Sequence, residues 1–131
     1  QLPSLMHAQK VQKKAARLGF DWNDLDGPIE KVKEEILEFM AQLQAGPDDT
    51  DPKKIEDEFG DVLFSLVNVG RRLGMDVETV LRQNVQKFRG RFLAMQVLAK
   101  AESLDIQSLD LATWDRLWNQ VKQNSPMLPL S

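Results

Sequence analysis

Apolar residues recur along this chain at steps of three and four, which is the spacing of helices with one buried face. The pattern predicts five helices, over residues 3–18, 28–44, 52–73 and 77–101 and around 114–121. Proline stands in the first turn of the second and third helices, and glycine follows the first three, as is usual at helix ends. No segment alternates with the period of a β-strand. We therefore predict an all-α bundle of about four to five helices.

Each predicted helix carries an apolar stripe that we expect to form the core. The third helix is apolar nearly all the way round from Phe59, which indicates a helix buried on most sides. The stripes of the first, second and fourth helices are, in order, Leu5, Met6, Val11, Ala15 and Leu18; Ile29, Val32, Ile36, Met40 and Leu43; Val77, Leu81, Phe88, Phe92 and Met95.

Four polar residues interrupt the third helix and fall on one flank of it. They are Glu58, Asp61, Ser65 and Asn68, at steps of three, four and three. Two carboxylates on the inner flank of a buried helix need a cation, because an unpaired buried carboxylate costs several kcal/mol or takes up a proton. The sequence leaves open whether this cation is Lys, Arg or a metal ion.

The second helix carries a further acidic group on the side away from its apolar stripe. A solvated acidic face beside Lys31 would by itself explain Glu34, Glu35 and Glu38. Glu35 and Glu38 are three residues apart, however, and the third helix has a second pair with this spacing. Two antiparallel helices can bring such pairs face to face, and four convergent carboxylates repel one another unless a cation lies between them.

The donor types restrict which metal ion such a site would hold. Oxygen-only ligands suit Mg²⁺, Mn²⁺ or Ca²⁺. A carboxylate-bridged di-iron site normally uses Glu-x-x-His pairs, whereas the only histidine, His7, is far from both acidic pairs in sequence. We therefore favour Mg²⁺, which proteins commonly bind together with substrate phosphates.

Polar side chains also follow the apolar stripe of the fourth helix. Asn84, Lys87 and Arg91 lie beside it at steps of three and four. Their spacing is compatible both with an inward role and with stems that lie along the apolar surface while the charges reach solvent. In the inward role they would hold the phosphates that the metal does not. With no Cys and no Ser-His-Asp set or Gly-rich phosphate loop, water is the nucleophile that the sequence offers.

Length and composition restrict the number of domains, the classes of partner and the compartment. A chain of 131 residues is long enough for one domain, and we expect residues 1–131 to form it, with a loosely ordered tail from about residue 124. The net charge of −3 argues against general nucleic-acid binding. No apolar run is long enough to span a membrane. The absence of cysteine is compatible with the cytoplasm. The chain begins at Gln1 rather than Met, so we expect a processed or trimmed piece of a longer protein.

The loop after the first helix contains two aromatic residues, Phe20 and Trp22. We expect Phe20 to anchor the loop in the core. Trp22 has two interpretations, a packing residue or a flat surface for a ring-shaped ligand, and composition favours packing.

Taken together, the motifs resemble the MazG nucleoside triphosphate pyrophosphohydrolases. The resemblance extends from about Leu2 to Lys122 and is strongest to the C-terminal catalytic domain of tandem-domain members. One departure is Gly90, where family members often have the first arginine of Lys-Phe-x-Arg-Arg-Phe. The segments that carry the resemblance are Lys14–Trp22, Glu34-Glu35-Ile36-Leu37-Glu38, Glu58-Phe59-Gly60-Asp61-Val62-Leu63-Phe64, Asn84-Val85-Gln86-Lys87-Phe88 and Leu117-Trp118.

The resemblance implies an all-α NTP pyrophosphatase fold that assembles as a homodimer. It also implies Mg²⁺-dependent hydrolysis of NTPs or dNTPs between the α and β phosphates, giving NMP and pyrophosphate, with Mn²⁺ as a possible substitute. By position, the implied metal ligands are Glu35, Glu38, Glu58 and Asp61.

The same resemblance assigns the remaining site residues. Glu34 would orient the attacking water, so that Glu34 and Glu38 are the implied catalytic residues. The implied substrate-binding residues are Lys31, Lys54, Asn84, Lys87, Arg91 and Trp118.

Two other functions remain as alternatives. One is a dUTPase-like pyrophosphatase of narrow base selectivity, against which Trp118 and the pattern of residues 84–92 argue. The other is a non-catalytic helical module that binds a nucleotide or a protein. The complete set of four carboxylates argues against that module.

Overall fold

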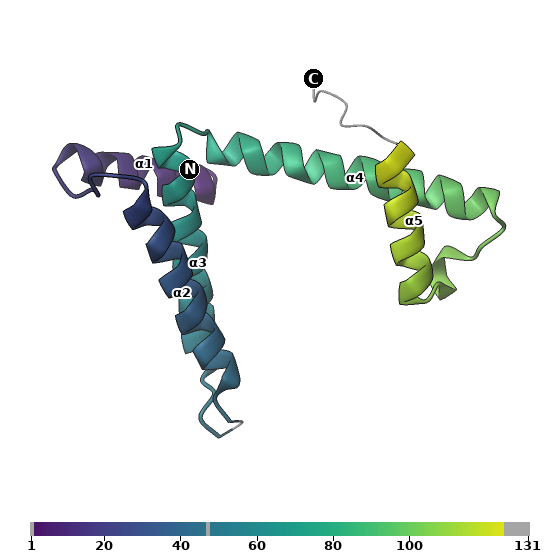
Figure 1. Ribbon diagram of the computed structural model, residues 1–131, viewed down its shortest axis with the longest axis horizontal. Helices are drawn as coiled ribbons and strands as arrows, with labels where there is room; N and C mark the ends of the chain where they lie inside the picture. Colours follow the sequence, from purple (N-terminus) through teal and green to yellow (C-terminus); the bar gives the residue numbers. More distant parts are fainter. Residues whose placement is uncertain (1, 47, 125–131) are drawn as a thin grey trace. The chain divides into compact units, whose positions relative to one another are not determined.

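The computed structural model describes residues 2–46 and 48–124, and the described chain is all-α (Figure 1). The predicted fold class is therefore confirmed. The loosely ordered tail that we predicted falls on residues beyond 124, outside the described part. Among the described residues no helix is both long and apolar enough to cross a membrane. The elements are α1 (Ser4–Arg17), α2 (Asp26–Gln44), α3 (Pro52–Arg72), α4 (Val77–Ala101), the 3₁₀ turn η1 (Ile106–Ser108) and α5 (Leu111–Asn124).

Local side-chain chemistry sets the helix ends. Asp51 caps α3 by accepting a hydrogen bond from the Lys53 amide at 3.0 Å, with Pro52 in the first helical position. Gly19 and Gly74 follow α1 and α3 with φ of 101° and 76°, a left-handed conformation that glycine adopts without steric cost. α2 begins at Asp26, two residues earlier than the sequence predicted.

The connector that we predicted between the last two helices contains a turn of 3₁₀ helix. Asp105 starts η1 by accepting a hydrogen bond from the amide of Gln107 at 3.1 Å. This local interaction orders a segment that its polar composition had marked only as a loop.

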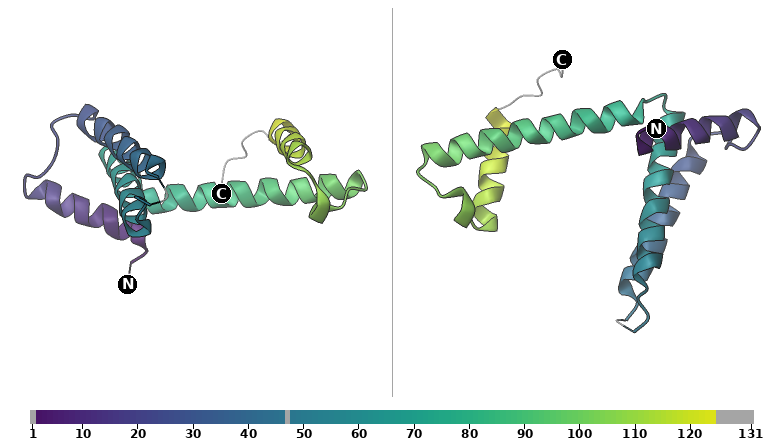
Figure 2. Two further views of the ribbon diagram at one scale, coloured as in Figure 1. Left: turned by 90° about the horizontal axis from the view of Figure 1, so that it is seen from below. Right: turned by 180° about the vertical axis from the view of Figure 1, so that it is seen from behind.

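The chain divides into two compact units, residues 1–80 and 81–131. In the first unit α2 lies along α3, and α1 also packs against α3 (Figure 2). In the second unit α5 packs on α4 through a small core of Met95, Ala99, Leu117 and Val121. The single domain that we expected stays a prediction.

Two glutamines of α1 connect this helix to the rest of the first unit. Gln9 donates to the carbonyl oxygen of Met75 at 2.6 Å and accepts from the amide of Val77 at 3.0 Å. Gln12 donates to the carbonyl oxygen of Phe64 at 2.9 Å. Both side chains are buried, so α1 is fixed by directional hydrogen bonds as well as by apolar packing.

The predicted apolar core is largely wrong for the first unit. On α2, the predicted stripe residues Ile36, Met40 and Leu43 are exposed. The third helix is not buried on most sides, since Phe59 and Leu66 are 47% and 50% exposed. The buried positions of α3 are instead Ser65, Val67 and Gly70. The reason is geometric: α1 and α2 can cover only one side of α3, and they cover the side that carries the polar line of Glu58, Asp61, Ser65 and Asn68.

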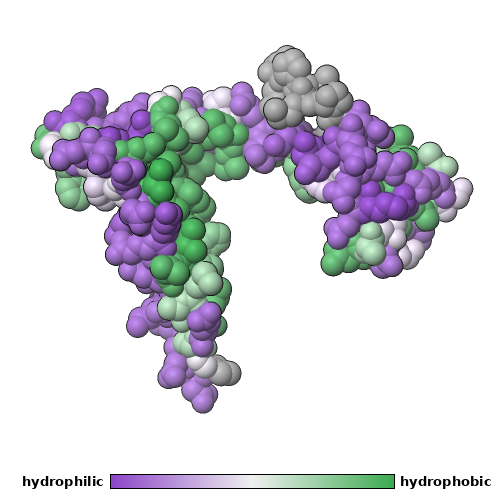
Figure 3. Space-filling model, in the orientation of Figure 1, coloured by the Kyte–Doolittle hydropathy of each residue, from purple (hydrophilic) through white to green (hydrophobic). Residues whose placement is uncertain are grey.

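The first and fourth helices show the same kind of difference. Val11 of α1 and Leu18 directly after it are exposed while the glutamines are buried. On α4, Leu81 and Phe88 are exposed while Met95 is buried as predicted. Hydrophobic side chains consequently lie on the surface of the first unit along α2 and α3 (Figure 3).

Candidate functional site

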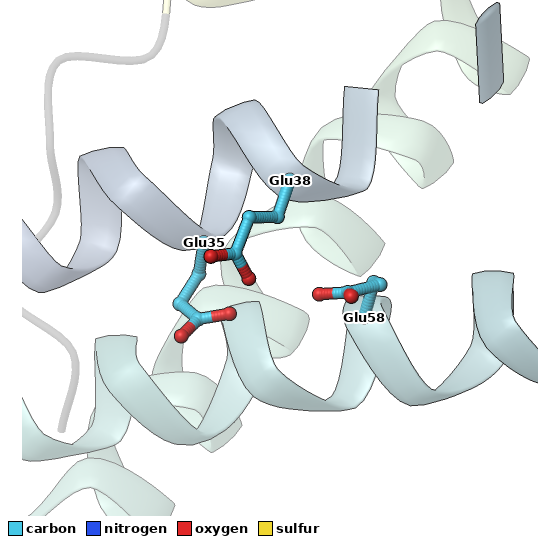
Figure 4. Close-up of side chains that lie close together, drawn as sticks. All are labelled: Glu35, Glu38 and Glu58. Atoms are coloured by element: carbon cyan, nitrogen blue, oxygen red, sulfur yellow. The ribbon is translucent and has the colours of Figure 1, made fainter. Parts of the chain in front are cut away.

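Three carboxylates from two helices meet in the first unit. Glu35 and Glu38 of α2 and Glu58 of α3 each offer an oxygen within 4.8 Å of the other two (Figure 4). The spacing of three residues puts Glu35 and Glu38 on one face of α2. Because α3 packs on that face, Glu58 lies opposite them.

Burial makes this cluster chemically unusual. Glu35 is only 6% exposed, although the sequence placed it on the side away from the core. One of its oxygens, Oε1, accepts from the ammonium of Lys31 at 3.1 Å. Its other oxygen, and Oε2 of Glu58, are buried and accept no hydrogen bond from any described residue. A buried anionic oxygen without a partner is costly unless a cation approaches it.

The charges of the cluster are not balanced by the protein. Glu35, aided by burial, raises the pKa of Glu38. Lys31 is the neighbouring cation, and hydrogen bonds to Glu34 and Glu35 raise the pKa of its ammonium. One ammonium facing three clustered carboxylates leaves an excess of negative charge. Oxygen donors with excess negative charge fit a hard divalent cation such as Mg²⁺.

Asp61, the fourth predicted ligand, lies one helical turn beyond Glu58, outside the group of three. Burial raises the pKa of its carboxyl, with further contributions from Asp57 and Glu35. Asp61 lines the same cavity as Glu35 and Lys31. It therefore borders the cluster, and its role as a ligand stays a prediction.

The other predicted residues of the first unit are exposed. The Glu34 carboxylate pairs with Lys31 at 3.0 Å and is 55% exposed. Lys54 lies near the start of α3, one turn before Glu58, with its side chain in solvent. Neither belongs to the group of three carboxylates, and their roles stay predictions.

A cavity of about 410 Å³ adjoins the cluster, and its wall includes Lys31, Glu35 and Asp61. Three aromatic side chains line the rest, together with polar residues of α1 and α3. This volume is within the range of small-molecule sites. The aromatic rings belong to Phe20, Trp22 and Phe64. Phe20 is 84% exposed, so the prediction that it anchors the loop in the core is wrong.

The loop that carries Phe20 and Trp22 is held by α3. Asp21 accepts hydrogen bonds from Arg71 at 2.8 Å and from Arg72 at 3.1 Å, and the carbonyl oxygen of Trp22 accepts from Arg72 at 2.7 Å. The hydrogen bonds that Asp21 accepts, above all the one from Arg71 and also those from the Trp22 amide and Arg72, lower its pKa to about 2. The loop is thereby ordered against the cavity.

Sequence reasoning missed Gln12, Asp21 and Arg71 as parts of this region. A usable signal for Gln12 was present, because Leu5, Gln9, Gln12 and Ala16 are spaced as one face of a helix. No comparable local signal marks the pairing of Asp21 with Arg71, which are 50 residues apart.

The remaining predicted substrate-binding residues lie in the second unit. Asn84, Lys87 and Arg91 are on α4 and Trp118 is on α5. The guanidinium of Arg91 lies over the Trp118 ring, 5.4 Å from its centroid, a distance that allows a cation–π interaction. Phe88 also packs against Trp118, with ring centroids 5.8 Å apart.

Comparison with known proteins decides the family. Residues 27–93 match the family model described as the MazG nucleotide pyrophosphohydrolase domain. The chain belongs to the MazG family. The matched region includes α2, α3 and most of α4, and therefore the three clustered carboxylates and Asp61. Trp118 lies outside it.

Longer MazG relatives match over nearly the whole chain. A nucleoside triphosphate pyrophosphohydrolase of Escherichia coli K12 is 41% identical over 122 residues, which are 93% of this chain and 46% of that protein. The nucleoside triphosphate pyrophosphohydrolase/pyrophosphatase MazG of Thermotoga maritima is 37% identical over 92% of this chain and 45% of its own length. The chain thus spans about half the length of these two relatives.

A third relative matches only a part of the chain. The uncharacterized protein YabN of Bacillus subtilis is 42% identical over 66 residues, half of this chain and 14% of that protein.

Proposed function

We propose that this chain is a catalytic MazG domain that hydrolyses nucleoside triphosphates between the α and β phosphates. The observation that carries the proposal is the convergence of Glu35, Glu38 and Glu58 with two buried, unpartnered carboxylate oxygens. The names of the Escherichia coli and Thermotoga maritima relatives supply the reaction class. Such a centre suits a phosphate-bearing substrate, since Mg²⁺ held by a few carboxylates commonly binds phosphates as well.

The carboxylates have separable roles in this proposal. Glu35, Glu38, Glu58 and Asp61 hold Mg²⁺, or Mn²⁺ in its place. The ion, when bound, neutralises phosphate charge and increases the electrophilicity of phosphorus. Glu34 accepts a hydrogen bond from the attacking water and orients it. The water oxygen forms a bond to one phosphorus of the α–β anhydride while the bridging P–O bond breaks, the water gives up a proton to solvent, and the products are NMP and pyrophosphate.

Cationic side chains hold the triphosphate in the same proposal. Lys87 and Arg91 bind phosphate oxygens, with Asn84 beside them, and Trp118 lies against the nucleotide. Lys31 and Lys54 are further substrate-binding residues in this proposal. The stacking of Arg91 on Trp118 supports a shared role, because stacking limits the conformations of the guanidinium and leaves its N–H groups free to donate to phosphate.

We also propose that the active form is a homodimer. Supporting this, both α2 and α3 carry several large apolar side chains that are about half exposed. Monomeric proteins rarely expose apolar surface of this extent on adjacent helices. A second copy would bury these side chains.

The experiment that tests the activity is product analysis. The purified chain is incubated with each of the common NTPs and dNTPs and MgCl₂, and products are resolved by ³¹P NMR or ion-exchange chromatography. We expect NMP and pyrophosphate in equal amounts and no reaction in EDTA. Release of NDP and orthophosphate, or no release with any nucleotide, would contradict the proposal. Hydrolysis of dUTP alone would favour the dUTPase-like alternative.

A further inference from the structure

We propose that Asp21 is a positioning residue that sets the register of α2 on α3 and, through it, the spacing of the clustered carboxylates. The inference rests on the proposed function only for the metal ion that these carboxylates hold. Its own support comes from the hydrogen bonds that tie the loop before α2 to the end of α3, and from the lack of such bonds between the two helices themselves.

Asp21 joins this loop to the last turn of α3. Its Oδ1 accepts a hydrogen bond from Arg71 at 2.8 Å, and its Oδ2 accepts one from Arg72 at 3.1 Å. The three side chains are between 10% and 22% exposed, so these bonds are largely shielded from water. Because both of its oxygens are bonded to arginine, Asp21 is not available as a metal ligand. Any effect that it has on the cluster must pass through the loop.

The loop carries this anchor into the first turn of α2. The Trp22 ring lies directly against the backbone of Gly27, where an added Cβ would overlap it. Asp24 accepts a hydrogen bond from the Gly27 amide at 3.2 Å, and Arg72 donates to the Trp22 carbonyl oxygen at 2.7 Å. The start of α2 is thus tied to the end of α3 by directional contacts.

Along their length α2 and α3 have no comparable link. Among their described residues no hydrogen bond or ion pair joins one helix to the other. Phe39 and Phe59 are in ring contact with centroids 5.6 Å apart, but ring pairs are favourable over a range of about 4.5–7 Å. The carboxylates repel one another, since Glu35 and Glu58 both raise the pKa of Glu38. The contacts near the cluster therefore leave the register to be fixed elsewhere.

A small slip between these helices is enough to disturb a magnesium site. A shift of one residue moves a helix by about 1.5 Å along its axis. Mg²⁺ requires near-octahedral ligands at about 2.0–2.1 Å, and functional groups must be held to within about 0.5 Å. Glu35 and Glu38 come from α2 and Glu58 from α3 (Figure 4), so a slip changes the distances between them directly.

Asp21→Asn is the first test. We expect the Kd for Mg²⁺, measured by isothermal titration calorimetry without nucleotide, to increase about 10-fold, the low end of the effect of residues behind metal ligands. In turnover, the Mg²⁺ concentration for half-maximal rate should rise by the same factor, while kcat at saturating Mg²⁺ stays nearly unchanged. A loss of stability alone would move neither value at a temperature where the variant is folded.

Arg72→Met separates positioning from the electrostatic effect of a changed charge. It removes the bonds of Arg72 to Asp21 and to the Trp22 carbonyl oxygen, and should also weaken Mg²⁺ binding. The two variants change the charge in opposite directions, so a purely electrostatic effect would weaken Mg²⁺ binding in Asp21→Asn and strengthen it in Arg72→Met. Tighter binding by Arg72→Met would overturn the inference.

Gln9→Met is the matched control for lost stability. Gln9 is buried on α1, and its amide bonds the backbone of Met75 and Val77 rather than the loop or α2. This variant should be less stable to heat but keep the Kd for Mg²⁺ of the unaltered chain. A Kd that rises equally in Gln9→Met and Asp21→Asn would show a general loosening of the fold and would contradict a specific role of Asp21.

The register itself can be measured without metal. The chain contains no cysteine, so spin labels can be attached at Lys33→Cys on α2 and Glu56→Cys on α3, both exposed. Double electron–electron resonance in EDTA, with labelled chain diluted in unlabelled chain, gives the distance between them. In Asp21→Asn the distance should shift, or its distribution widen, by at least about 1.5 Å, one residue of register. Gln9→Met should match the unaltered chain.

The two proposals fail in different ways. If Asp21→Asn leaves both the Kd for Mg²⁺ and the label distance unchanged, the positioning role is wrong, and pyrophosphate release by the unaltered chain would still support the proposed function. If the label distance changes as expected but the unaltered chain binds no Mg²⁺ and hydrolyses no nucleotide, the proposed function is wrong and the control of the register by Asp21 stands.

Discussion

At the scale of single residues, Glu35 shows how binding and stability compete in this protein. It is a buried carboxylate with one oxygen paired to Lys31 and the other without a donor among the described residues. A buried ion pair contributes little net stability, because desolvation offsets most of the attraction. The arrangement is therefore better explained by the cation that it can hold than by the folding of α2 onto α3.

Glu38→Gln tests the metal role of the cluster. We expect pyrophosphate release to fall by at least about 100-fold, since even outer-shell partners of metal ligands contribute 10- to 100-fold. The melting temperature in EDTA should rise, because Glu38 and Glu35 repel each other. The increase in melting temperature on adding MgCl₂ should disappear.

The control for this variant is Glu30→Gln, which removes the same charge from α2 at an exposed residue that pairs only with Lys33 among its described neighbours. It should keep both activity and the response to MgCl₂. Full activity in Glu38→Gln would exclude the metal assignment.

Asp21→Asn tests the link between the aromatic loop and α3. We expect a loss of about 1–3 kcal/mol at pH 7, as for hydrogen bonds to charged groups. The pKa of Asp21 is about 2 in the folded chain against an ordinary 3.8, so its stabilisation is complete above about pH 4 and is lost as pH falls towards 2.

Urea unfolding from pH 2 to 7 measures this difference. The curves of the unaltered chain and of Asp21→Asn should converge at the acid end and separate at neutral pH. Asp49→Asn, the same change of charge in the loop between α2 and α3, should follow the unaltered chain throughout. If the stabilities of Asp21→Asn and of the unaltered chain differ by the same amount from pH 2 to 7, the ion pairs of Asp21 contribute no stability that depends on its protonation.

At the scale of elements, the start of α2 is shaped around Trp22. A Cβ atom on Gly27 would lie 2.1 Å from the Trp22 ring, so the ring rests directly on the backbone of the first turn. The loop is fixed from the other side by Arg72, which bonds the carbonyl oxygen of Trp22. Trp22 thus packs against α2, the interpretation that composition favoured, and it also lines the cavity.

Gly27→Ala should displace this ring. We expect a destabilisation of about 1–3 kcal/mol from overpacking, which denaturant unfolding measures. Gly60→Ala is the control, since outside its chain neighbours and the nearby backbone of α3 no described atom lies within 4 Å of a Cβ there, and it should stabilise α3 by about 0.5–1 kcal/mol.

At the scale of the whole molecule, the notable property is the apolar surface of the first unit. Ile36, Leu63 and Leu66 of the adjacent helices α2 and α3 are each at least 40% exposed. The polar line of α3 is directed towards its neighbours within the chain instead. A chain with this distribution would gain stability from association, because apolar surface removed from water contributes about 25 cal/mol per Å².

Leu66→Asp tests the dimer that we propose. Sedimentation equilibrium should give a dimer for the unaltered chain and a dimerisation constant at least about 100-fold weaker for the variant, because the change occurs twice in a symmetric interface. Leu18→Asp, the same change at a residue that is 82% exposed after α1, should leave the constant unchanged. A monomeric unaltered chain would contradict the proposal.

The sequence alone determined the helices and the acidic pairs. Spacing, proline and glycine are local signals, and they located α3 and α4 to within a residue and put Glu35 and Glu38 on one face of α2. Which face of a helix is buried is not a local property, because it depends on the neighbours that pack there. The sequence therefore assigned the apolar stripes of α2 and α3 to the core, whereas in the first unit the polar line of α3 faces inward.

Only the tertiary structure decided which groups meet. It brought Glu58 to Glu35 and Glu38, gave Glu35 a partner for one oxygen only, and joined Asp21 to Arg71 across 50 residues. It also buried Gln12 beside a cavity that no motif had indicated. These contacts depend on the packing of α1 and α2 against α3, and such long-range packing leaves little trace in the spacing of residues along one helix.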